Sequence, residues 1–161
     1  MAMIYISLGS NIHAKKNILS GLEALSEEFL ELKLSQVYES ESVGFSGDNF
    51  INLVAQAQTD LSVEEVTHVL KQIEKEQGRI KNIEKFSDRT LDLDLLLYDD
   101  LICSSPVELP RDEIHKNAFV LKPLVDLIPE QKHPLLLKTY SQLWKSFTAD
   151  QKLWVVDLYK A

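Results

Sequence analysis

The sequence runs Arg89-Thr90-Leu91-Asp92-Leu93-Asp94-Leu95-Leu96-Leu97-Tyr98 near its middle, where two carboxylates stand one residue apart inside an apolar run. Successive side chains of a β-strand point to opposite faces, so a strand here would place Asp92 and Asp94 on one face and leucines on the other. Adjacent like charges repel unless a cation lies between them, and carboxylates together with substrate phosphates bind Mg²⁺. Arg89 could supply positive charge for those phosphates. A solvent-facing edge strand alternates in the same way, so the pattern alone leaves both interpretations open.

The composition is that of an ordinary globular protein, with 161 residues, 45% hydrophobic and 26% charged. We expect a single domain over residues 1–161. The net charge of −8 argues against sequence-independent nucleic-acid binding, which relies on a positive surface. Cys103 is the sole cysteine, which excludes an intrachain disulfide. No signal peptide or membrane-spanning apolar segment is recognisable, so we expect a cytoplasmic protein that does not associate with membranes.

The hydrophobic pattern predicts alternating strands and amphipathic helices. Strands are expected at residues 3–8, 32–38 and 49–58, around the aspartates, at 101–102 and at 154–158, and helices at 14–30, from Ser62 to near 78, beyond Pro110 through 127, and at 141–147. Ser62 and Glu65 have the spacing of a capping box. The order strand, helix, strand, strand, helix, strand indicates a mixed α/β (α+β) fold with a ferredoxin-like βαββαβ core, in which helices pack on a mainly antiparallel sheet.

Four cations lie between the second predicted helix and the aspartates, namely Arg79, Lys81, Lys85 and Arg89. Lysine and arginine after a helix offset its dipole, and loops are commonly charged, which accounts for one or two of them. Four cations leading into a carboxylate pair in an acidic protein are the layout expected where a polyphosphate meets Mg²⁺.

Several short motifs occur in a characteristic order. They are Tyr5-Ile6-Ser7-Leu8-Gly9-Ser10-Asn11, Tyr38-Glu39-Ser40, Asn49-Phe50-Ile51-Asn52, Ile73-Glu74, Gln77-Gly78-Arg79, Arg89-Thr90-Leu91-Asp92-Leu93-Asp94 and Phe119-Val120-Leu121-Lys122-Pro123-Leu124. In this order and at these spacings, nearly the whole chain resembles the 6-hydroxymethyl-7,8-dihydropterin pyrophosphokinase family of folate biosynthesis. The resemblance implies a three-layer α/β/α monomer that uses two Mg²⁺ ions and ATP as co-substrate. Its partners would be small molecules: ATP, which binds first, and the pterin that receives the pyrophosphate.

The resemblance also implies roles for individual residues. Asp92 and Asp94 match the magnesium ligands and, with Arg89 and Lys85, would form the catalytic group. Matches to the nucleotide site or the catalytic loop are Glu74, Arg79, Lys81, Lys85, Phe86, Arg89 and Arg111. Matches to the pterin pocket are Ser40, Val43, Phe50, Asn52 and Phe119, of which Asn52 would hydrogen-bond the pterin and Phe119 would stack on it. Without the resemblance, Phe119 would be interpreted as a core residue and Asn52 as a strand residue that satisfies backbone groups.

The chain departs from the family pattern in two segments. The catalytic loop usually reads basic-aromatic-Gly-Pro-Arg, whereas here it is Lys85-Phe86-Ser87-Asp88-Arg89. Arg111 stands at the usual histidine position and Asn117 at the usual arginine position, while Glu41 replaces a loop proline. His115 lies four residues after Arg111, so on a helix it would share that face and could substitute for the missing imidazole.

These departures leave three interpretations open. The chain is an active pyrophosphokinase of this pterin, a diverged relative that acts on another pterin-like alcohol, or a non-catalytic module that binds a pterin or a nucleotide.

Overall fold

A six-stranded antiparallel sheet forms the centre of the protein, whose computed structural model describes residues 1–41, 48–77 and 90–159. The strands are β1 (Ala2–Ser10), β2 (Leu30–Leu34), β3 (Val37–Ser40), β4 (Phe50–Thr59), β5 (Asp92–Tyr98) and β6 (Leu153–Val156). Their order across the sheet is β5-β1-β4-β3-β6, with β2 also paired to β4. This order, with β1 between β5 and β4, confirms the ferredoxin-like arrangement expected from the chain.

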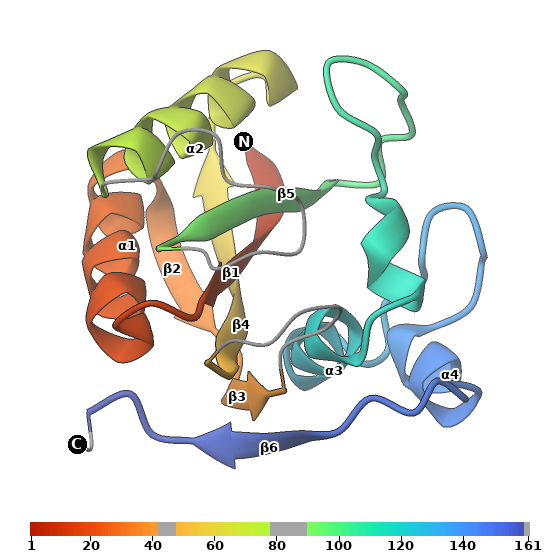
Figure 1. The fold of residues 1–161 in the computed structure, drawn as a ribbon. Coiled ribbons are helices and arrows are strands. Elements are labelled where there is room, and N and C mark those ends of the chain that lie inside the picture. The colour runs from red at the N-terminus through yellow and green to blue at the C-terminus, as the bar shows by residue number, and fades with distance from the viewer. Residues whose placement is uncertain (42–47, 78–89, 160–161) are drawn as a thin grey trace.

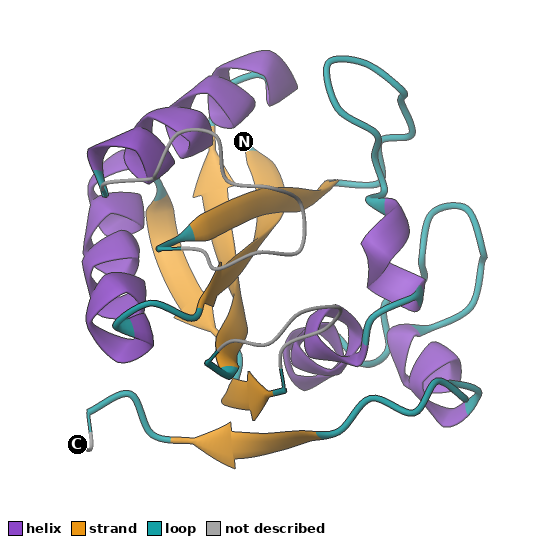
Figure 2. Ribbon diagram, in the orientation of Figure 1, coloured by secondary structure: helices purple, strands orange, loops and turns teal. Residues whose placement is uncertain are grey.

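Helices cover both faces of the sheet (Figures 1 and 2). The helices α1 (Ala14–Glu28) and α2 (Val63–Glu76) pack on one face, and α3 (Ala118–Leu127), α4 (Tyr140–Lys145) and the short 3-10 helix η1 (Asp112–His115) lie on the other. Three of the expected helical segments form with small shifts at their ends, whereas the stretch expected beyond Pro110 through 127 is divided into η1 and α3. The result is the expected three-layer α/β/α sandwich.

Alternation along the central strands produces two hydrophobic cores. On β1, Ile4, Ile6 and Leu8 pack in the core beneath α1 and α2, whereas Tyr5 belongs to the core beneath α3 and α4. Both cores are built on the same strands, so the sheet is buried between two helical layers and its strands are correspondingly apolar.

The start of α2 follows the sequence prediction. The Ser62 side chain accepts a hydrogen bond from the Glu65 N–H, and the Glu65 side chain accepts one from the Ser62 N–H. This capping box satisfies N–H groups that the first turn of a helix leaves without partners.

The single strand expected at residues 32–38 is wrong in detail, because β2 and β3 are separate. Leu34 pairs with Ala55 and Tyr38 pairs with Asn52. The chain from Leu34 to Tyr38 is therefore one residue longer than the stretch of β4 that it faces. At the break, the Ser35 hydroxyl accepts a hydrogen bond from the Val54 N–H at 2.9 Å. The Ser35 side chain therefore accepts the hydrogen bond where the extra residue interrupts the backbone ladder.

The partner strand expected at residues 101–102 is also wrong. β5 ends at Tyr98, and Asp99, with φ of 49°, turns the chain away from the sheet while its backbone and side chain bond the backbone of Met3. Leu101 and Ile102 consequently lie exposed in a loop, which is closed by a bridge between Cys103 and Leu109.

Candidate active site

The two aspartates occupy one face of β5, as their spacing predicts. Leu91, Leu93 and Leu95 point into the core beneath α1 and α2, so Asp92 and Asp94 face the α3 side. Asp92 pairs with Gly9 and Asp94 with Ser7 on β1, which fixes the position of both carboxylates on the sheet. Each is only partly buried.

A row of directly opposed residues crosses the sheet from Asp92. Gly9 on β1 pairs with both Asp92 and Asn52, and Asn52 on β4 pairs with Tyr38 on β3. Directly opposed residues of antiparallel strands share a face, so Asp92, Asn52 and Tyr38 all point towards α3. A Cβ atom at position 9 would lie 2.6 Å from Asn52 Nδ2. Glycine therefore lets the Asn52 amide lie directly against β1, where a side chain at position 9 would displace it.

Asn52 is buried, with 6% of its surface exposed. Within the described part of the chain, its Oδ1 atom has no hydrogen-bond partner. A buried acceptor without a partner is costly, and such atoms are rare unless a ligand or water satisfies them. The amide oxygen is consequently available to a donor group of a ligand.

Ser40 and Phe50 extend the same face of the sheet. They oppose each other in the β3–β4 ladder, two residues from the pair formed by Tyr38 and Asn52. Side chains two residues apart on a strand share a face. The sheet thus brings together three of the predicted pterin-binding residues, which come from two strands.

Phe119 lies in the first turn of α3 and packs partly against the core on the Asn52 side. A hydrogen-bonded group joins this helix to the sheet: the Tyr38 hydroxyl donates to Asp126 at 2.5 Å, and Lys122 Nζ lies 2.7 Å from the same carboxylate. Burial raises the pKa of the Tyr38 hydroxyl, and its hydrogen bond to Asp126 raises it further. Sequence reasoning gave Tyr38 and Asp126 no role.

Arg111 contacts β5 beside the aspartates. It precedes η1 in an extended conformation, and its Nη2 atom lies 3.3 Å from Asp94 Oδ1. Glu113 also belongs to this neighbourhood: burial raises the pKa of its carboxyl, the Asp94 and Asp92 charges raise it further, and Arg111 opposes them. Sequence reasoning did not identify Glu113, because no periodicity or spacing connects η1 to β5.

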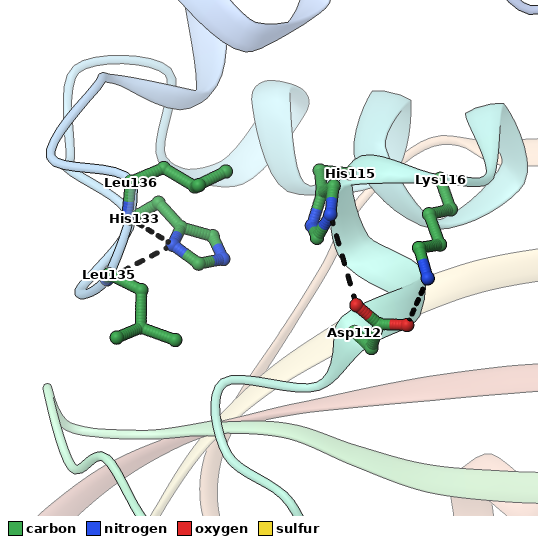
Figure 3. A network of polar contacts seen from close by, with 6 residues as sticks. All are labelled: Asp112, His115, Lys116, His133, Leu135 and Leu136. Atoms are coloured by element: carbon green, nitrogen blue, oxygen red, sulfur yellow. Dashed lines mark hydrogen bonds and ion pairs between the residues drawn. The ribbon is translucent and has the colours of Figure 1, made fainter.

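The expectation that His115 shares a helical face with Arg111 is wrong. Only residues 112–115 are helical, and Arg111 turns to Asp94 while His115 Nε2 lies 3.8 Å from Asp112 Oδ1. Figure 3 shows His115 on the side of η1 that faces His133, and the two rings are 6.1 Å apart. His115 therefore belongs to a separate polar group rather than to the carboxylate site.

Glu74 is buried on α2 beneath the start of β5. Its Oε2 atom accepts a hydrogen bond from the Leu93 N–H at 2.9 Å, and 5% of its surface is exposed. This contact fixes the backbone between the two aspartates. The predicted role of Glu74 in nucleotide binding stays a prediction.

The remaining predicted residues lie outside the described part of the chain. They are Val43, Arg79, Lys81, Lys85, Phe86 and Arg89, and the unusual Ser87-Asp88 pair lies there too.

The residues on β5 suit a magnesium ion bound together with a phosphate. Over residues 1–41, 48–77 and 90–159, no group of three or more His, Cys, Asp or Glu side chains is arranged to hold a metal ion unaided. Mg²⁺ usually binds through one or two carboxylates and takes its remaining oxygens from water and substrate phosphates. The pair of Asp92 and Asp94 is such a donor set.

An open groove of about 670 Å³ lies elsewhere, at the start of α1. Its lining includes Ile51, whose side chain packs in the core beneath α1 and α2. The groove therefore opens on the opposite side of the sheet from Asn52 and the aspartates.

Comparison with known proteins agrees with the motifs. Residues 5–129 match the family described as 7,8-dihydro-6-hydroxymethylpterin-pyrophosphokinase (HPPK). The 2-amino-4-hydroxy-6-hydroxymethyldihydropteridine pyrophosphokinase of Aquifex aeolicus is 40% identical over 86% of this chain and 88% of its own length. The Haemophilus influenzae protein of the same name is 32% identical over 95% of this chain and 97% of its own. The folic acid synthesis protein fol1 of Pneumocystis carinii is 38% identical, and the match covers 22% of that longer protein.

Solved structures show the same fold. The HPPK-DHPS protein of Plasmodium falciparum with pteroate aligns with a TM-score of 0.72 over 91% of this chain and 42% of that one, at 15% identity. Among the described residues, no helix is both long and apolar enough to cross a membrane. The motifs, the family match and the similar full-length relatives agree, and the chain belongs to the 7,8-dihydro-6-hydroxymethylpterin-pyrophosphokinase family.

Proposed function

We propose that the protein transfers pyrophosphate from ATP to the hydroxymethyl group of 6-hydroxymethyl-7,8-dihydropterin in a magnesium-dependent reaction. The observation that carries the proposal is the row across the sheet, where Gly9 lies between Asp92 and Asn52 and lets the Asn52 amide, whose Oδ1 has no hydrogen-bond partner among the described residues, lie against β1. One end of this row suits a metal-bound phosphate. Asn52, on the other side of Gly9, offers a buried amide oxygen as an acceptor for a heterocycle.

The pterin would lie between Asn52 and the ring of Phe119. A pterin carries ring N–H and amino donors, one of which would satisfy Asn52 Oδ1, and its flat ring suits stacking on an aromatic side chain. Fixing the heterocycle in this way directs its hydroxymethyl group along the row towards Asp92. This orientation lowers the entropic cost of bringing two substrates together.

In the reaction, the pterin hydroxyl oxygen forms a bond to the β-phosphorus of ATP while the bond between that phosphorus and the oxygen of the α-phosphate breaks. AMP departs with this bridging oxygen, and the hydroxyl proton is released. Asp92 and Asp94 would hold Mg²⁺, of which two ions are expected, and the metal supplies positive charge that offsets the charge on the phosphate oxygens. From the sequence we assign phosphate contacts to Arg89 and Lys85, with Arg79, Lys81, Phe86 and Arg111 completing the nucleotide site.

An assay with isotope-labelled ATP tests this proposal. We expect AMP and the pterin diphosphate to form in equal amounts only when Mg²⁺ and the pterin are both present. AMP without pterin diphosphate, or tight pterin binding without product, would refute the activity. A panel of hydroxymethyl heterocycles extends the test, because a preference for another alcohol would redirect the assignment to that substrate.

Removal of either metal ligand should stop the reaction. Asp92→Asn and Asp94→Asn keep the size of the side chain but remove its charge, so we expect turnover to fall by about a thousandfold or more. Glu108→Gln, on the loop before η1, is the matched control for loss of a carboxylate. Turnover near that of the control in either variant would exclude the residue as a metal ligand. The monomeric state and cytoplasmic location expected from the sequence stay predictions.

A further inference from the structure

Arg111 is attached to β5 at three points. Its backbone N–H donates to Leu96 O at 3.0 Å, its Nε donates to Leu95 O at 3.2 Å, and its Nη2 lies 3.3 Å from Asp94 Oδ1. The first contact holds the backbone of Arg111 against the strand, and the second holds its side chain there. The third places the positive charge of the guanidinium on a predicted metal ligand.

The anchoring carbonyls belong to a β-bulge. Tyr5 pairs with Leu97 and Ile6 with Leu95, so Leu96 is an extra residue without an opposite partner on β1. A bulge interrupts the regular ladder and redirects groups of the bulged strand. Here the consecutive carbonyls of Leu95 and Leu96 accept hydrogen bonds from Arg111, which explains why this arginine meets β5 just after Asp94.

The charges around Arg111 are mainly negative. Asp92, Asp94 and Glu113 form an acidic neighbourhood, and the side chains of Arg111 and Asp94 are 26% and 39% exposed. A guanidinium so placed offsets part of the repulsion between the carboxylates. A divalent cation that binds Asp94 would compete with it for the same carboxylate.

We propose that Arg111 is a built-in counter-ion of Asp94, which weakens binding of a divalent cation on its own and contacts phosphate when the cation arrives with a nucleotide. Asp94 is then released to the metal while Arg111 gains the negative charge of the phosphates. The site would in consequence bind metal and nucleotide cooperatively. By linkage, each ligand must strengthen binding of the other by the same factor. The inference rests on the proposed function, because it assumes that Asp94 is a metal ligand.

The side-chain type matters for this role. The Nε atom of arginine can stay bonded to Leu95 O while the two Nη atoms contact a carboxylate or a phosphate. A lysine has a single nitrogen at its end and no second donor that could stay on Leu95 O while the first moves from the carboxylate to a phosphate. Arg111 thus has a function that the histidine usual at this position in the family would not supply in the same way.

Mn²⁺ binding provides a test that does not depend on activity. Calorimetry would measure the affinity of Mn²⁺ alone, and then in the presence of the non-cleavable analogue α,β-methylene-ATP, for wild type, Arg111→Met and Arg111→Lys. We expect Arg111→Met to bind Mn²⁺ alone about fivefold more tightly, since it removes a partly exposed competing charge. Its affinity for the Mn²⁺–analogue complex should fall by about tenfold. Arg111→Lys should lie between Arg111→Met and wild type in both measurements.

Lys116→Met is the matched control. Lys116 follows η1 and is paired with Asp112, away from the carboxylate pair, so the same change of charge there should leave both affinities near wild type. Equal affinities for Mn²⁺ alone in Arg111→Met and Lys116→Met would overturn the inference. Weaker binding in Arg111→Met would also overturn it, because Arg111 would then support metal binding.

Asp94→Asn separates this inference from the proposed function. If Asp94→Asn binds Mn²⁺ as wild type does, the metal does not bind at Asp94, and the proposed metal centre fails. If Asp94→Asn loses binding while Arg111→Met matches the control, the metal centre stands and the counter-ion role fails. Circular dichroism verifies that each variant is folded. Arg111→Gln, which removes the charge but keeps a hydrogen-bond donor, replaces Arg111→Met if that variant does not fold.

Discussion

Gly9 has a spatial role that its flexibility does not explain. It is the second-last residue of β1 and lies between Asp92 on one neighbouring strand and Asn52 on the other. Glycine in a strand weakens it, because it offers no side chain to pack and loses more backbone entropy on folding. At this position the missing side chain makes room for the Asn52 amide, which we propose binds the pterin.

Gly9→Ala should impair pterin binding more than stability. The new Cβ atom would meet Asn52 Nδ2 at 2.6 Å, and the amide can rotate away because it is the end of a side chain. We expect pterin affinity, measured by calorimetry, to fall by about tenfold or more, the size of a lost buried hydrogen bond. Gly21→Ala on α1 is the control, since its Cβ meets only Leu91 in the opposite core. Equal pterin affinities in the two variants would contradict the role of Gly9.

At the level of residues, strand alternation predicted correctly which face a side chain occupies. Contacts between residues far apart in the chain could not be predicted in this way. The spacing of Asp92 and Asp94 predicted their common face, because a strand allows only two directions for a side chain. The ion pair of Arg111 with Asp94 joins positions 17 residues apart and depends on a bulge. The extra leucine of that bulge is indistinguishable in the sequence from its neighbours.

Among the elements, α3 is placed over the site by polar contacts as well as by its apolar face. Tyr38 on β3 bonds Asp126, and Lys122 pairs with Asp126 and lies 5.8 Å from the centre of the Tyr38 ring. Tyr38 also opposes Asn52 in the sheet. This group therefore links the helix that carries Phe119 to the strand next to the amide.

Tyr38→Phe should weaken pterin binding without touching the ligand site directly. The substitution keeps the ring but removes the hydroxyl that donates to Asp126 Oδ2, while Lys122 stays paired with Oδ1, at a cost of about 1–3 kcal/mol in the free energy of unfolding. We expect a several-fold lower pterin affinity and little change in the affinity for nucleotide, as measured by calorimetry. Tyr98→Phe is the control, because Tyr98 donates to Leu61 O, and Leu61 packs in the core beneath α1 and α2. A similar loss of pterin affinity in both variants would indicate a general effect of stability.

The loop between α3 and α4 depends on the protonation of His133. This residue is 2% exposed, and its Nδ1 atom accepts hydrogen bonds from the Leu135 and Leu136 N–H groups (Figure 3). Burial lowers the pKa of His133 below its usual value of 6.5, and the nearby His115 lowers it further. A proton on Nδ1 would remove the acceptor of both bonds.

The stability of the protein should consequently fall in mildly acidic solution. The unfolded chain takes up a proton at His133 below about pH 6.5, whereas the folded chain resists it, so stability is full above that pH and is lost as pH falls towards the folded pKa. His133→Asn keeps an acceptor near the Nδ1 position and does not titrate. Urea denaturation between pH 5 and pH 8 should show a steeper loss for wild type, and parallel curves for the two proteins would disprove the contribution of His133.

Element boundaries were predictable where a local signal marks them. The Ser62 capping box set the start of α2 because its hydrogen bonds connect residues only three apart. The division of residues 30–40 into β2 and β3 has no such signal, since it depends on the register against β4. The segment at Leu101 is apolar enough for a strand, but the turn at Asp99 takes it away from the sheet.

Across the whole molecule, one sheet supports two cores. Leu25 on α1 packs in the first core and Leu124 on α3 in the second, and β1, β4 and β5 contribute to both. Loss of packing on either side therefore disturbs the same strands. We propose on this basis that residues 1–161 unfold as one cooperative domain.

Leu25→Ala and Leu124→Ala should each lower the stability of the entire protein. Both side chains are fully buried, and such truncations cost about 2–5 kcal/mol. Tryptophan fluorescence and far-ultraviolet circular dichroism should report one coincident urea transition in each variant. Two separate transitions would show instead that the α1–α2 layer and the α3–α4 layer are independent units.

The overall topology followed from the order of elements, because short connections between antiparallel strands leave few alternatives. The convergence of Asp92, Asn52 and Phe119 came from family resemblance, since neither composition nor periodicity specifies which strands become neighbours. One contact of Gln151, which follows α4, was indicated neither by the order of elements nor by the family resemblance. Its side chain accepts a hydrogen bond from the Ala118 N–H at the start of α3, 33 residues away in the chain.

The close packing of the Asn52 amide on Gly9 also has a consequence for drug resistance. An inhibitor that hydrogen-bonds this amide would depend on a side chain whose position requires a glycine on the neighbouring strand. Escape through a bulkier residue at position 9 would require a side chain that collides with the Asn52 amide. Such a mutation would exclude the inhibitor and displace a substrate contact together, so resistance at this position should reduce the fitness of the organism that acquires it.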